Sequence, residues 1–343
     1  MSGESEVQYR KLGKSGLEVS EICFGVMGFT GKGGWDHVAK TDQQDADRLT
    51  AEAIDRGVNF FDTADIYSSG NSEKMLGHAL QGKRHKVLIA SKCGFRMKEG
   101  PMGDGLSRSR ILEACEASLR RLKTDYIDLY QIHSFDFQVP LEETIGTFDL
   151  LVKQGRVRYI GLSNFTGWQL MKAMALCDKY NWEPFISLQA YYSLLGRDLE
   201  FELVPACIDQ GLGILPWSPL HGGILSGKYR DKAKWPKNTR LKGPGEHLPY
   251  DIKKGEKILT VLDKIAAGRG MSISQIALNF LLQKPAVCSV VIGARNQKQL
   301  RENIAAGGWA LDREEMQLLD QVSAPPKPYP QWYFDIFRKN RMG

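Results

Sequence analysis

The sequence of 343 residues lacks features that several classes of protein require. It contains no apolar run approaching the roughly 18 residues of a membrane-spanning helix, so no membrane partner is expected. The first residues, "MSGESEVQYRKLG", have no apolar h-region, which predicts no secretory signal and a cytoplasmic location. With 42% hydrophobic and 25% charged residues, the composition is that of a globular protein with ample material for a core.

Cysteine clusters and a basic stripe are missing as well. The six cysteines are dispersed, without a CxxC pair or metal-ligand spacing, and several stand in apolar runs such as "EICFG". They therefore predict buried, reduced thiols and no metal. Lys and Arg exceed Asp and Glu by a net charge of +6 but are spread along the whole chain. This distribution argues against nucleic acid and is compatible with a small anionic ligand.

Eight short apolar runs have the length of strands, and most are too continuously apolar for a sheet with one wet face. These runs are 21–25, 59–63, 86–92, 127–133, 157–164, 185–192, 213–220 and 289–294. Between them lie helix-like segments at 42–57, 72–80, 107–123, 141–155, 166–180, 199–211, 272–284 and 296–306. Asp42 or Ser72 at their starts, and Gly57, Gly155 or Gly211 just past their ends, are typical helix boundaries.

This alternation predicts an α/β fold with a parallel sheet covered on both faces. An open doubly wound sheet fits the pattern too, but eight units without a domain break favour a (β/α)8 TIM barrel. We predict one domain over 1–343, with its core at about 7–325. The excess residues form an N-terminal hairpin turning at Lys14–Gly16, a long loop at 230–251, and a C-terminal helix with an aromatic and basic tail at 325–343.

In such a barrel the active site lies at the C-terminal ends of the strands. Asp62, Lys92 and His133 end the second, third and fourth runs, and Tyr67 follows Asp62 in "NFFDTADIY". Each has a simpler interpretation: Asp62 could cap a turn, Lys92 could mark the exit into solvent, His133 could be a core histidine and Tyr67 a packing aromatic. Their occurrence on successive barrel units favours a shared site.

Together the four side chains could protonate an oxygen as hydride arrives at its carbon. The pKa of a tyrosine hydroxyl lies near 10, and an adjacent lysine ammonium lowers it by favouring the phenolate. A buried Lys92 needs a partner for its charge, and Asp62 on the neighbouring strand end can supply one. A neutral His133 could orient a carbonyl or relay its proton.

At this point the sequence resembles the aldo-keto reductase superfamily, over about residues 7–325. The resemblance is carried by "FDTADIY" with "SEKMLG", "DYIDLYQIH", "IGLSNF" and "VIGARNQKQLREN", in the family's order and on the expected strands. It implies that Asp62, Tyr67, Lys92 and His133 are the catalytic tetrad, with Tyr67 as proton donor. The implied activity is reversible NADPH-dependent reduction of a small aldehyde or ketone to an alcohol.

The cofactor cannot be held by a Rossmann fingerprint, because no GxGxxG follows the first strand. The segment "HGGILSGKY" contains GxxxxGK at Gly222, Gly227 and Lys228, yet it fails as a Walker motif because Tyr229 replaces the Ser or Thr that would hold magnesium. A glycine-rich loop with a lysine remains suited to phosphates. By the resemblance it covers the pyrophosphate of a nicotinamide dinucleotide, through Ser218, Pro219, Leu220, Gly222 and Lys228.

The resemblance implies further contacts at both ends of the cofactor. Trp217 would stack on the nicotinamide ring, and the carboxamide would meet Ser163, Asn164 and Gln189. At the adenosine end Arg295, Gln299 and Asn303 are expected on the helix after the last strand, with Glu302 and Asn303 matched to adenine contacts and Gly293 as a further contact. Arg295 would face the 2′-phosphate, with Arg240 in the long loop as a further candidate. Some family branches carry Lys-Ser and a later Arg where this chain has Gly293-Ala294 and Gln299, which leaves NADH as the alternative to NADPH.

"PWSPLHGGILSGKY" is most similar to the branch that contains bacterial aldo-keto reductases and the β subunits of voltage-gated potassium channels. The alternative function is therefore a cofactor-bearing regulatory subunit. Only about eight residues precede the hairpin, so the long N-terminal segment of some channel subunits is not expected.

The substrate pocket is expected to involve Met27, Trp35 and Phe95. The aromatic residues Trp35, Phe29 and Phe95 suggest an apolar or ring-shaped substrate, or simply packing. The aromatic tail leaves three interpretations open. It could cover the site, bind a second subunit in a homo-oligomer, or pack under the barrel.

Overall fold

The computed structural model describes residues 7–30, 41–100, 102–230, 248 and 251–341. Eight parallel strands form one sheet in the order β10-β3-β4-β5-β6-β7-β8-β9. Their bounds are β3 Ile22–Gly25, β4 Phe60–Asp62, β5 Leu88–Cys93, β6 Ile127–Ile132, β7 Val157–Ser163, β8 Phe185–Tyr191, β9 Gly213–Trp217 and β10 Val290–Ile292. The sheet curls round until the chain just before β10 meets β9, where Ile214 N donates to Ala286 O at 2.7 Å and Cys288 N donates to Ile214 O at 3.1 Å.

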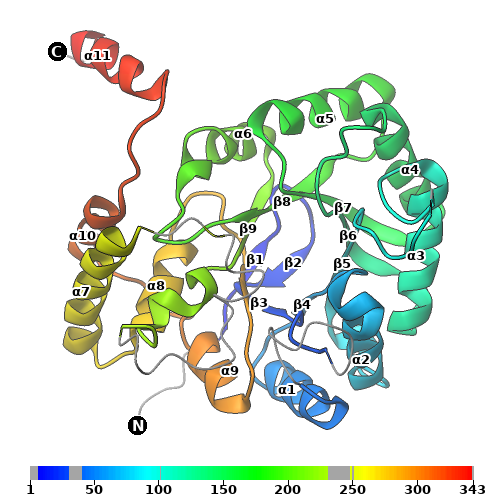
Figure 1. Ribbon diagram of the computed structural model, residues 1–343, viewed down its shortest axis with the longest axis horizontal. Helices are drawn as coiled ribbons and strands as arrows, with labels where there is room; N and C mark the ends of the chain where they lie inside the picture. Colours follow the sequence, from blue (N-terminus) through cyan, green and yellow to red (C-terminus); the bar gives the residue numbers. More distant parts are fainter. Residues whose placement is uncertain (1–6, 31–40, 101, 231–247, 249–250, 342–343) are drawn as a thin grey trace.

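Helices surround this ring of strands (Figure 1). The first six are α1 Gln43–Asp55, α2 Asn71–Ala79, α3 Arg108–Leu122, α4 Leu141–Lys153, α5 Gly167–Tyr180 and α6 Leu203–Gln210. The next five are α7 Ile252–Arg269, α8 Ile273–Leu282, α9 Gln297–Ile304, α10 Arg313–Ser323 and α11 Gln331–Arg341. Short 3-10 helices are η1 Tyr67–Gly70, η2 Arg84–Lys86, η3 Asp198–Glu200 and η4 His221–Ser226. The predicted (β/α)8 TIM barrel is confirmed, with all eight predicted strands in place.

The N-terminal hairpin closes one end of the barrel. Strands β1 Tyr9–Lys11 and β2 Glu18–Ser20 pair antiparallel, as predicted, and lie across the centre of the ring in Figure 1. Leu12 and Val19 from this hairpin pack into an interior cluster with apolar side chains from the N-terminal ends of the strands, including Phe60, Leu129 and Leu215. The hairpin therefore plugs the N-terminal end of the barrel and leaves the other end for polar side chains.

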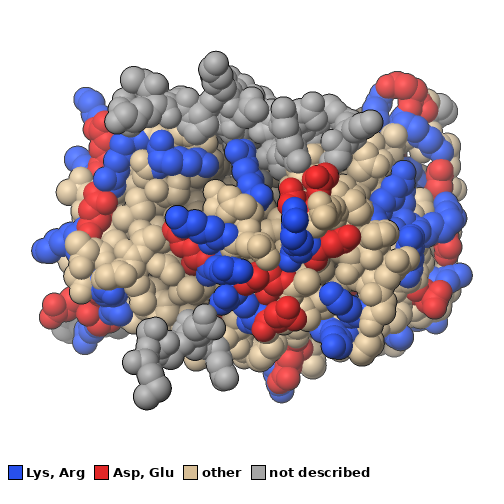
Figure 2. All heavy atoms as spheres, turned by 90° about the horizontal axis from the view of Figure 1, so that it is seen from below, with Lys and Arg blue, Asp and Glu red and all other residues tan. Residues whose placement is uncertain are grey.

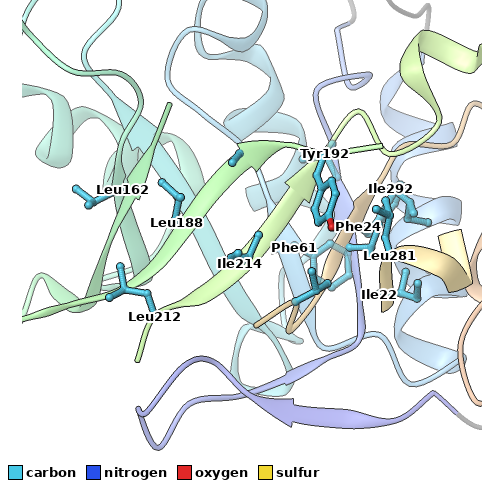
Figure 3. Close-up of a cluster of buried hydrophobic side chains, with 14 of the residues drawn as sticks. Ile22, Phe24, Phe61, Leu162, Leu188, Tyr192, Leu212, Ile214, Leu281 and Ile292 are labelled. Atoms are coloured by element: carbon cyan, nitrogen blue, oxygen red, sulfur yellow. The ribbon is translucent and has the colours of Figure 1, made fainter. Parts of the chain in front are cut away.

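The outward-facing side chains of the strands pack against the helices. Figure 3 shows part of this larger cluster, in which Leu162, Leu188 and Ile214 come from three successive strands. All three are fully buried, and each such side chain contributes about 1.5–3 kcal/mol of burial free energy. The predicted burial of the six cysteines is also confirmed, since every one is a buried free thiol.

Three helices fall outside the one-helix-per-strand pattern that the sequence predicted, and one of them, α10, is the predicted C-terminal helix. Helix α7 was not predicted, and it follows directly on the segment predicted as a long loop. Asp251 caps its start by accepting from Lys254 N, and Gly270 ends the helix at φ 64°. Helix α11 lies in the predicted tail. In Figure 1 it stands apart at one side of the barrel, and Gln331 at its start donates to Phe201 O at 3.1 Å. Two interpretations of the tail, covering the site and packing under the barrel, are therefore wrong for this chain.

Charged side chains of both signs are interspersed over the face shown in Figure 2. An example of such pairing joins α1 and α9, where Arg301 and Arg56 contact Glu52 at 2.7 and 2.5 Å. These hydrogen bonds, from Arg301 first and Arg56 second, lower the pKa of Glu52 to about 2. Among the described residues, no helix is both long and apolar enough to cross a membrane.

Candidate active site

The polar end of the barrel is built from alternate residues of neighbouring strands. Sheet register places Lys92 beside Gln131, Gln131 beside Gly161, and Gly161 beside Ser187, so all four occupy one layer. One residue pair further along, Ser163 and Gln189 are register partners in the next layer toward the mouth. Strand side chains alternate between faces, so residues two apart on one strand both face the interior of the barrel. This inward face is apolar at the hairpin end and polar at the C-terminal end.

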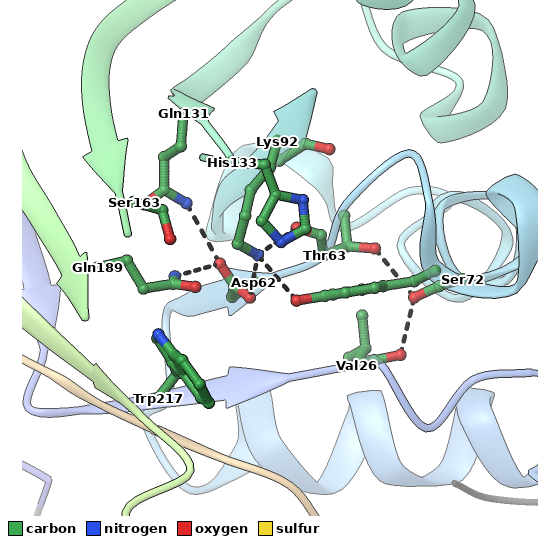
Figure 4. A network of polar contacts seen from close by, with 12 residues as sticks. Val26, Asp62, Thr63, Ser72, Lys92, Gln131, His133, Ser163, Gln189 and Trp217 are labelled. Atoms are coloured by element: carbon green, nitrogen blue, oxygen red, sulfur yellow. Dashed lines mark hydrogen bonds and ion pairs between the residues drawn. The ribbon is translucent and has the colours of Figure 1, made fainter. Parts of the chain in front are cut away.

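Lys92 is the centre of this polar group (Figure 4). Its side chain is fully buried, and its Nζ donates to Asp62 Oδ2 at 2.7 Å, to Thr63 O at 2.7 Å and to Tyr67 Oη at 3.3 Å. An ammonium has three donors, so these three acceptors satisfy it. Burial alone lowers the pKa of Lys92, but the charge of Asp62 and the contact with Tyr67 outweigh this and raise it above its ordinary value. Lys92 is therefore a buried cation, which rules out the simpler interpretation that it exits into solvent.

The loop after β4 brings Tyr67 back to Lys92. Tyr67 begins η1, whose Ser68 and Ser69 both have left-handed backbone, at φ 48° and 54°. Ser72 was predicted to begin the next helix, but α2 begins at Asn71, with Gly70 before it. The Ser72 hydroxyl instead donates to Val26 O at 2.7 Å and contacts Thr63 Oγ1 at 2.9 Å (Figure 4). Ser72 thus fastens the Tyr67 loop to the first barrel strand rather than capping a helix.

His133 lies across from Tyr67, with ring centroids 5.9 Å apart at 82°. Its ring is buried, and its Nδ1 has no hydrogen-bond partner among the described residues. Burial, followed by the charge of Lys92, lowers the pKa of His133 well below its ordinary value. The imidazole is therefore neutral at pH 7.

Gln131 belongs to this group and was not singled out from the sequence. Its Nε2 lies 3.3 Å from Asp62 Oδ1, the oxygen to which Gln189 Nε2 also donates at 2.8 Å. Gln131 on β6 and His133, which directly follows this strand, are two residues apart, and residues at this spacing in extended chain share a face. That spacing is the signal by which the sequence could have revealed Gln131.

Next to the tetrad, Trp217 and Asn164 form the entrance to a second region. Trp217 Nε1 donates to Asn164 Oδ1 at 3.1 Å, while Asn164 Nδ2 donates to His133 O at 2.9 Å and to Ser163 Oγ at 3.1 Å. Asn164 adopts φ 55°, a left-handed conformation that asparagine tolerates better than most residues. The residues expected at the nicotinamide therefore lie together beside the tetrad (Figure 4).

A cavity of about 350 Å³ continues from Trp217 between η4 and α9. It brings together ten residues that the sequence analysis assigned to the cofactor: Ser218, Pro219, Leu220, Gly222, Lys228, Gly293, Arg295, Gln299, Glu302 and Asn303. Arg295 precedes α9 rather than lying on it, and its backbone N donates to Gln299 Oε1 at 3.0 Å. Gly223, Ser226 and Ser274 also line the cavity and were not predicted.

Glycine is required in the wall of this cavity. Gly222 and Gly223 have φ of 62° and 99°, and a Cβ on Gly223 would lie 2.6 Å from Lys228 Nζ. The glycine therefore allows the lysine to lie close against the backbone of the loop. A loop with a lysine and left-handed glycines fits a phosphate-bearing ligand.

The expected substrate residues are only partly described. Phe95 is exposed at the mouth and stacks obliquely against His133, with centroids 4.5 Å apart. Met27 is half-buried in the loop after β3. Trp35, like Arg240 of the cofactor set, lies outside the described residues. In the part of the chain that the structure describes, no group of three or more His, Cys, Asp and Glu could hold a metal ion.

Comparison with known proteins decides the family. The model of the "Aldo/keto reductase family" matches residues 21–324. The chain belongs to the aldo/keto reductase family. It is 37% identical to an uncharacterized oxidoreductase of Bacillus subtilis over 93% of this chain and 97% of that protein. A versiconal hemiacetal acetate reductase of Aspergillus parasiticus is 32% identical, over 94% of this chain and 99% of that protein.

This aldo/keto reductase also has a relative of another kind. A probable voltage-gated potassium channel subunit beta of Arabidopsis thaliana is 32% identical over 88% of this chain and 91% of that protein. The family assignment makes the protein an NAD(P)H-dependent oxidoreductase acting on small-molecule carbonyl compounds.

Proposed function

We propose that this aldo/keto reductase uses NADPH to reduce an aldehyde or ketone to an alcohol, with Tyr67 as the proton donor. The observation that carries the proposal is the fully buried Lys92 ammonium, held 2.7 Å from Asp62 and 3.3 Å from Tyr67 Oη. A buried lysine bonded to a tyrosine oxygen stabilises negative charge on that oxygen. Such charge develops as a tyrosine gives up its proton.

The direction of the Lys92 bond supports this role for Tyr67. Lys92 can only donate, so Tyr67 Oη accepts, and the tyrosine O–H is not used in that bond. Tyr67 can then donate its proton to a carbonyl oxygen at the mouth, while neutral His133 orients the same oxygen by a hydrogen bond. A bound nicotinamide supplies the hydride that makes this oxygen basic. Asp62 keeps Lys92 charged throughout, through the contact at 2.7 Å.

The residues around the cavity fit a nicotinamide dinucleotide. Ser163, Asn164 and Gln189 offer hydrogen bonds for a carboxamide next to the tetrad, and Trp217 offers a ring face for stacking. Lys228 and the η4 backbone would hold the pyrophosphate. Exposed Arg295 at the far end of the cavity would bind a 2′-phosphate, and this charge is the reason to propose NADPH over NADH.

For the substrate we propose an apolar or ring-shaped carbonyl compound. A cavity of about 400 Å³ adjoins the His133 side of the mouth, between the loops after β5 and β6. Its lining includes Phe95, Phe135 and Phe137, the last of which is 85% exposed. Aromatic faces of this kind favour flat apolar groups. The same lining carries Arg96, Asp104 and Asp136, so the non-reacting part of the substrate would contact charged groups as well as these rings.

The test is oxidation of NADPH and of NADH, followed by absorbance with a panel of aldehydes, ketones and keto-sugars. We expect turnover with NADPH, higher kcat/KM for aromatic than for short polar carbonyls, and weaker use of NADH. Turnover restricted to NADH would overturn the cofactor proposal. Equal rates for aromatic and polar carbonyls would overturn the substrate proposal.

The relative named as a potassium channel subunit supports one alternative, a cofactor-binding regulatory subunit with little turnover. The same assay distinguishes the two functions by whether bound NADPH is oxidised. Tight binding of NADPH without oxidation by any carbonyl of the panel, together with stable association with a channel protein, would favour the regulatory subunit.

A further inference from the structure

Gln131 reaches Asp62 from the layer below the mouth. Its side chain is fully buried on β6, and Figure 4 shows it directed at Asp62. The carboxylate of Asp62 only accepts hydrogen bonds while ionised, so the amide nitrogen of Gln131 must be the atom that faces it, at 3.3 Å. Asp62 Oδ1 thus accepts from two neutral amides, and Oδ2 from Lys92.

The neighbouring strands make room for this side chain. Gly161 on β7 is the register partner of Gln131, and a Cβ there would lie 3.0 Å from Gln131 Cγ and 2.6 Å from Ser187 Oγ. Gln131 Oε1 has no hydrogen-bond partner among the described residues, which is unfavourable for a buried carbonyl. Leu129, two residues earlier on the same face, shows that an apolar side chain suits the interior of this strand. A polar Gln131 is therefore not explained by packing.

Gln189 and Gln131 differ in what else they can touch. Gln189 stands in the layer of Ser163, next to the expected carboxamide site, whereas Gln131 is a layer deeper, beside Lys92. Neither lines the cavity between η4 and α9. A change at Gln131 therefore alters the hydrogen bonds of Asp62 without removing a contact assigned to the cofactor.

We propose that Gln131 is a positioning residue that holds the carboxylate of Asp62 turned toward Lys92, so that Lys92 stays in place beneath Tyr67. The inference rests on the proposed role of Tyr67 as proton donor. The ionisable groups that act on Asp62 are Lys92 on β5 and Cys23 on β3. Tyr67 in the loop after β4 and His133 after β6 interact with Lys92. Among the described contacts of Asp62, β8 contributes only the neutral amide of Gln189.

Two substitutions separate this role from packing. Gln131→Leu removes one of the two amide donors to Asp62 and keeps a similar volume, so we expect the acid limb of the kcat/KM profile to move up by about one pH unit. Gln131→Glu keeps the size and sets a second carboxylate beside Asp62, so the acid limb moves up by about two units or more. The affinity for NADPH should stay within about twofold in both variants, because Gln131 does not line the cavity assigned to the cofactor.

Ser187→Ala is the matched control, because Ser187 lies in the same buried layer and makes no contact with Asp62 among the described hydrogen bonds. Its profile should superimpose on that of the unchanged protein. If Gln131→Leu and Gln131→Glu lower the rate equally at every pH, then Gln131 has only a packing role and the proposal is wrong.

A second measurement does not depend on turnover. Relative to the unchanged protein, Gln131→Glu should lose stability as the pH rises from about 4 to 7, because the folded state holds a proton shared between two close carboxylates. Chemical unfolding across this range measures the difference, and parallel stability curves would also overturn the proposal. If Tyr67→Phe keeps normal reduction, the proposed function fails instead, while the unfolding experiment still decides the role of Gln131.

Discussion

The two halves of the barrel mouth differ in how they are held. On the tetrad side, from β4 to β6, buried polar groups contact one another, and Lys92 alone has three acceptors within 3.3 Å. On the cofactor side, from β9 to α9, the wall is made of left-handed backbone around a cavity of about 350 Å³. The first half is ordered by its own side chains. The second has the form of a site that a ligand completes.

This difference has an energetic meaning. A buried ion pair such as Lys92–Asp62 costs desolvation, so its value lies in holding the reacting groups in place before substrate arrives. Charges on the cofactor side remain near solvent, so they cost little in the folded protein and act when an anionic ligand binds. Substitutions on the tetrad side should thus affect chemistry and stability, and those on the cofactor side should affect affinity.

The largest effect is expected for Tyr67→Phe. Losing the proton donor should lower kcat/KM for carbonyl reduction by about 10³-fold, roughly 4 kcal/mol, because general acid catalysis contributes on this scale. Titration of intrinsic fluorescence should give an unchanged affinity for NADPH. Tyr159→Phe, which removes a hydroxyl from another barrel strand, serves as the control. Near-normal turnover by Tyr67→Phe would show that the tetrad side does not perform the proton transfer.

Lys92→Met should cost stability as well as activity. It leaves Asp62 buried without its cation, and breaking one partner of a buried pair costs about 3 kcal/mol. Urea unfolding measures this loss. The double variant Asp62→Asn with Lys92→Met should recover much of the stability while staying inactive, since no unpaired charge remains. A single variant as stable as the unchanged protein would contradict the contrast between the two halves.

On the cofactor side, Arg295→Ala should weaken NADPH binding about tenfold, or about 1.4 kcal/mol, by removing a charge-assisted contact to the 2′-phosphate. NADH affinity and the free energy of unfolding should change little. The matched control is Lys298→Ala, which also removes one positive charge. Lys298 lies on α9 and does not line the cavity. Equal losses for the two cofactors would refute the assignment of Arg295.

Per pH unit, the smallest effect is expected for Asp65 in the Tyr67 loop, which tests the tetrad side again. Burial first and the charge of Glu73 second raise the pKa of Asp65 to about 7, although Arg110 lies 3.2 Å away and opposes the shift. A folded-state pKa above the unfolded value gives stability that is present below about pH 4 and lost as the pH rises through 7. The unchanged protein should therefore lose about 1 kcal/mol per pH unit over this window relative to Asp65→Asn. Parallel unfolding curves would show that Asp65 stays ionised.

Much of the fold could be predicted because its signals are local. Alternating apolar runs and amphipathic segments mark the strands and helices, and boundary residues such as Asp42 and Gly211 mark where helices begin and end. Helix α7 was missed although its capping Asp251 and its final Gly270 are present. The alternation of one helix per strand left no place for it. The prediction for Ser72 was wrong although serine is a common helix-capping residue. Its hydroxyl makes a tertiary contact with Val26 O instead of capping a helix.

The sequence by itself determined which residues stand at the mouth. Asp62 ends β4, Lys92 is the penultimate residue of β5 and His133 directly follows β6. The C-terminal ends of these parallel strands meet at one edge. Tertiary structure alone decided how these groups bond. The clearance at Gly161, the approach of Gln131 to Asp62 and the position of α11 beside the barrel depend on contacts between residues far apart in the chain. Such contacts leave no periodic trace in a sequence, because they arise only when the strands close into a ring.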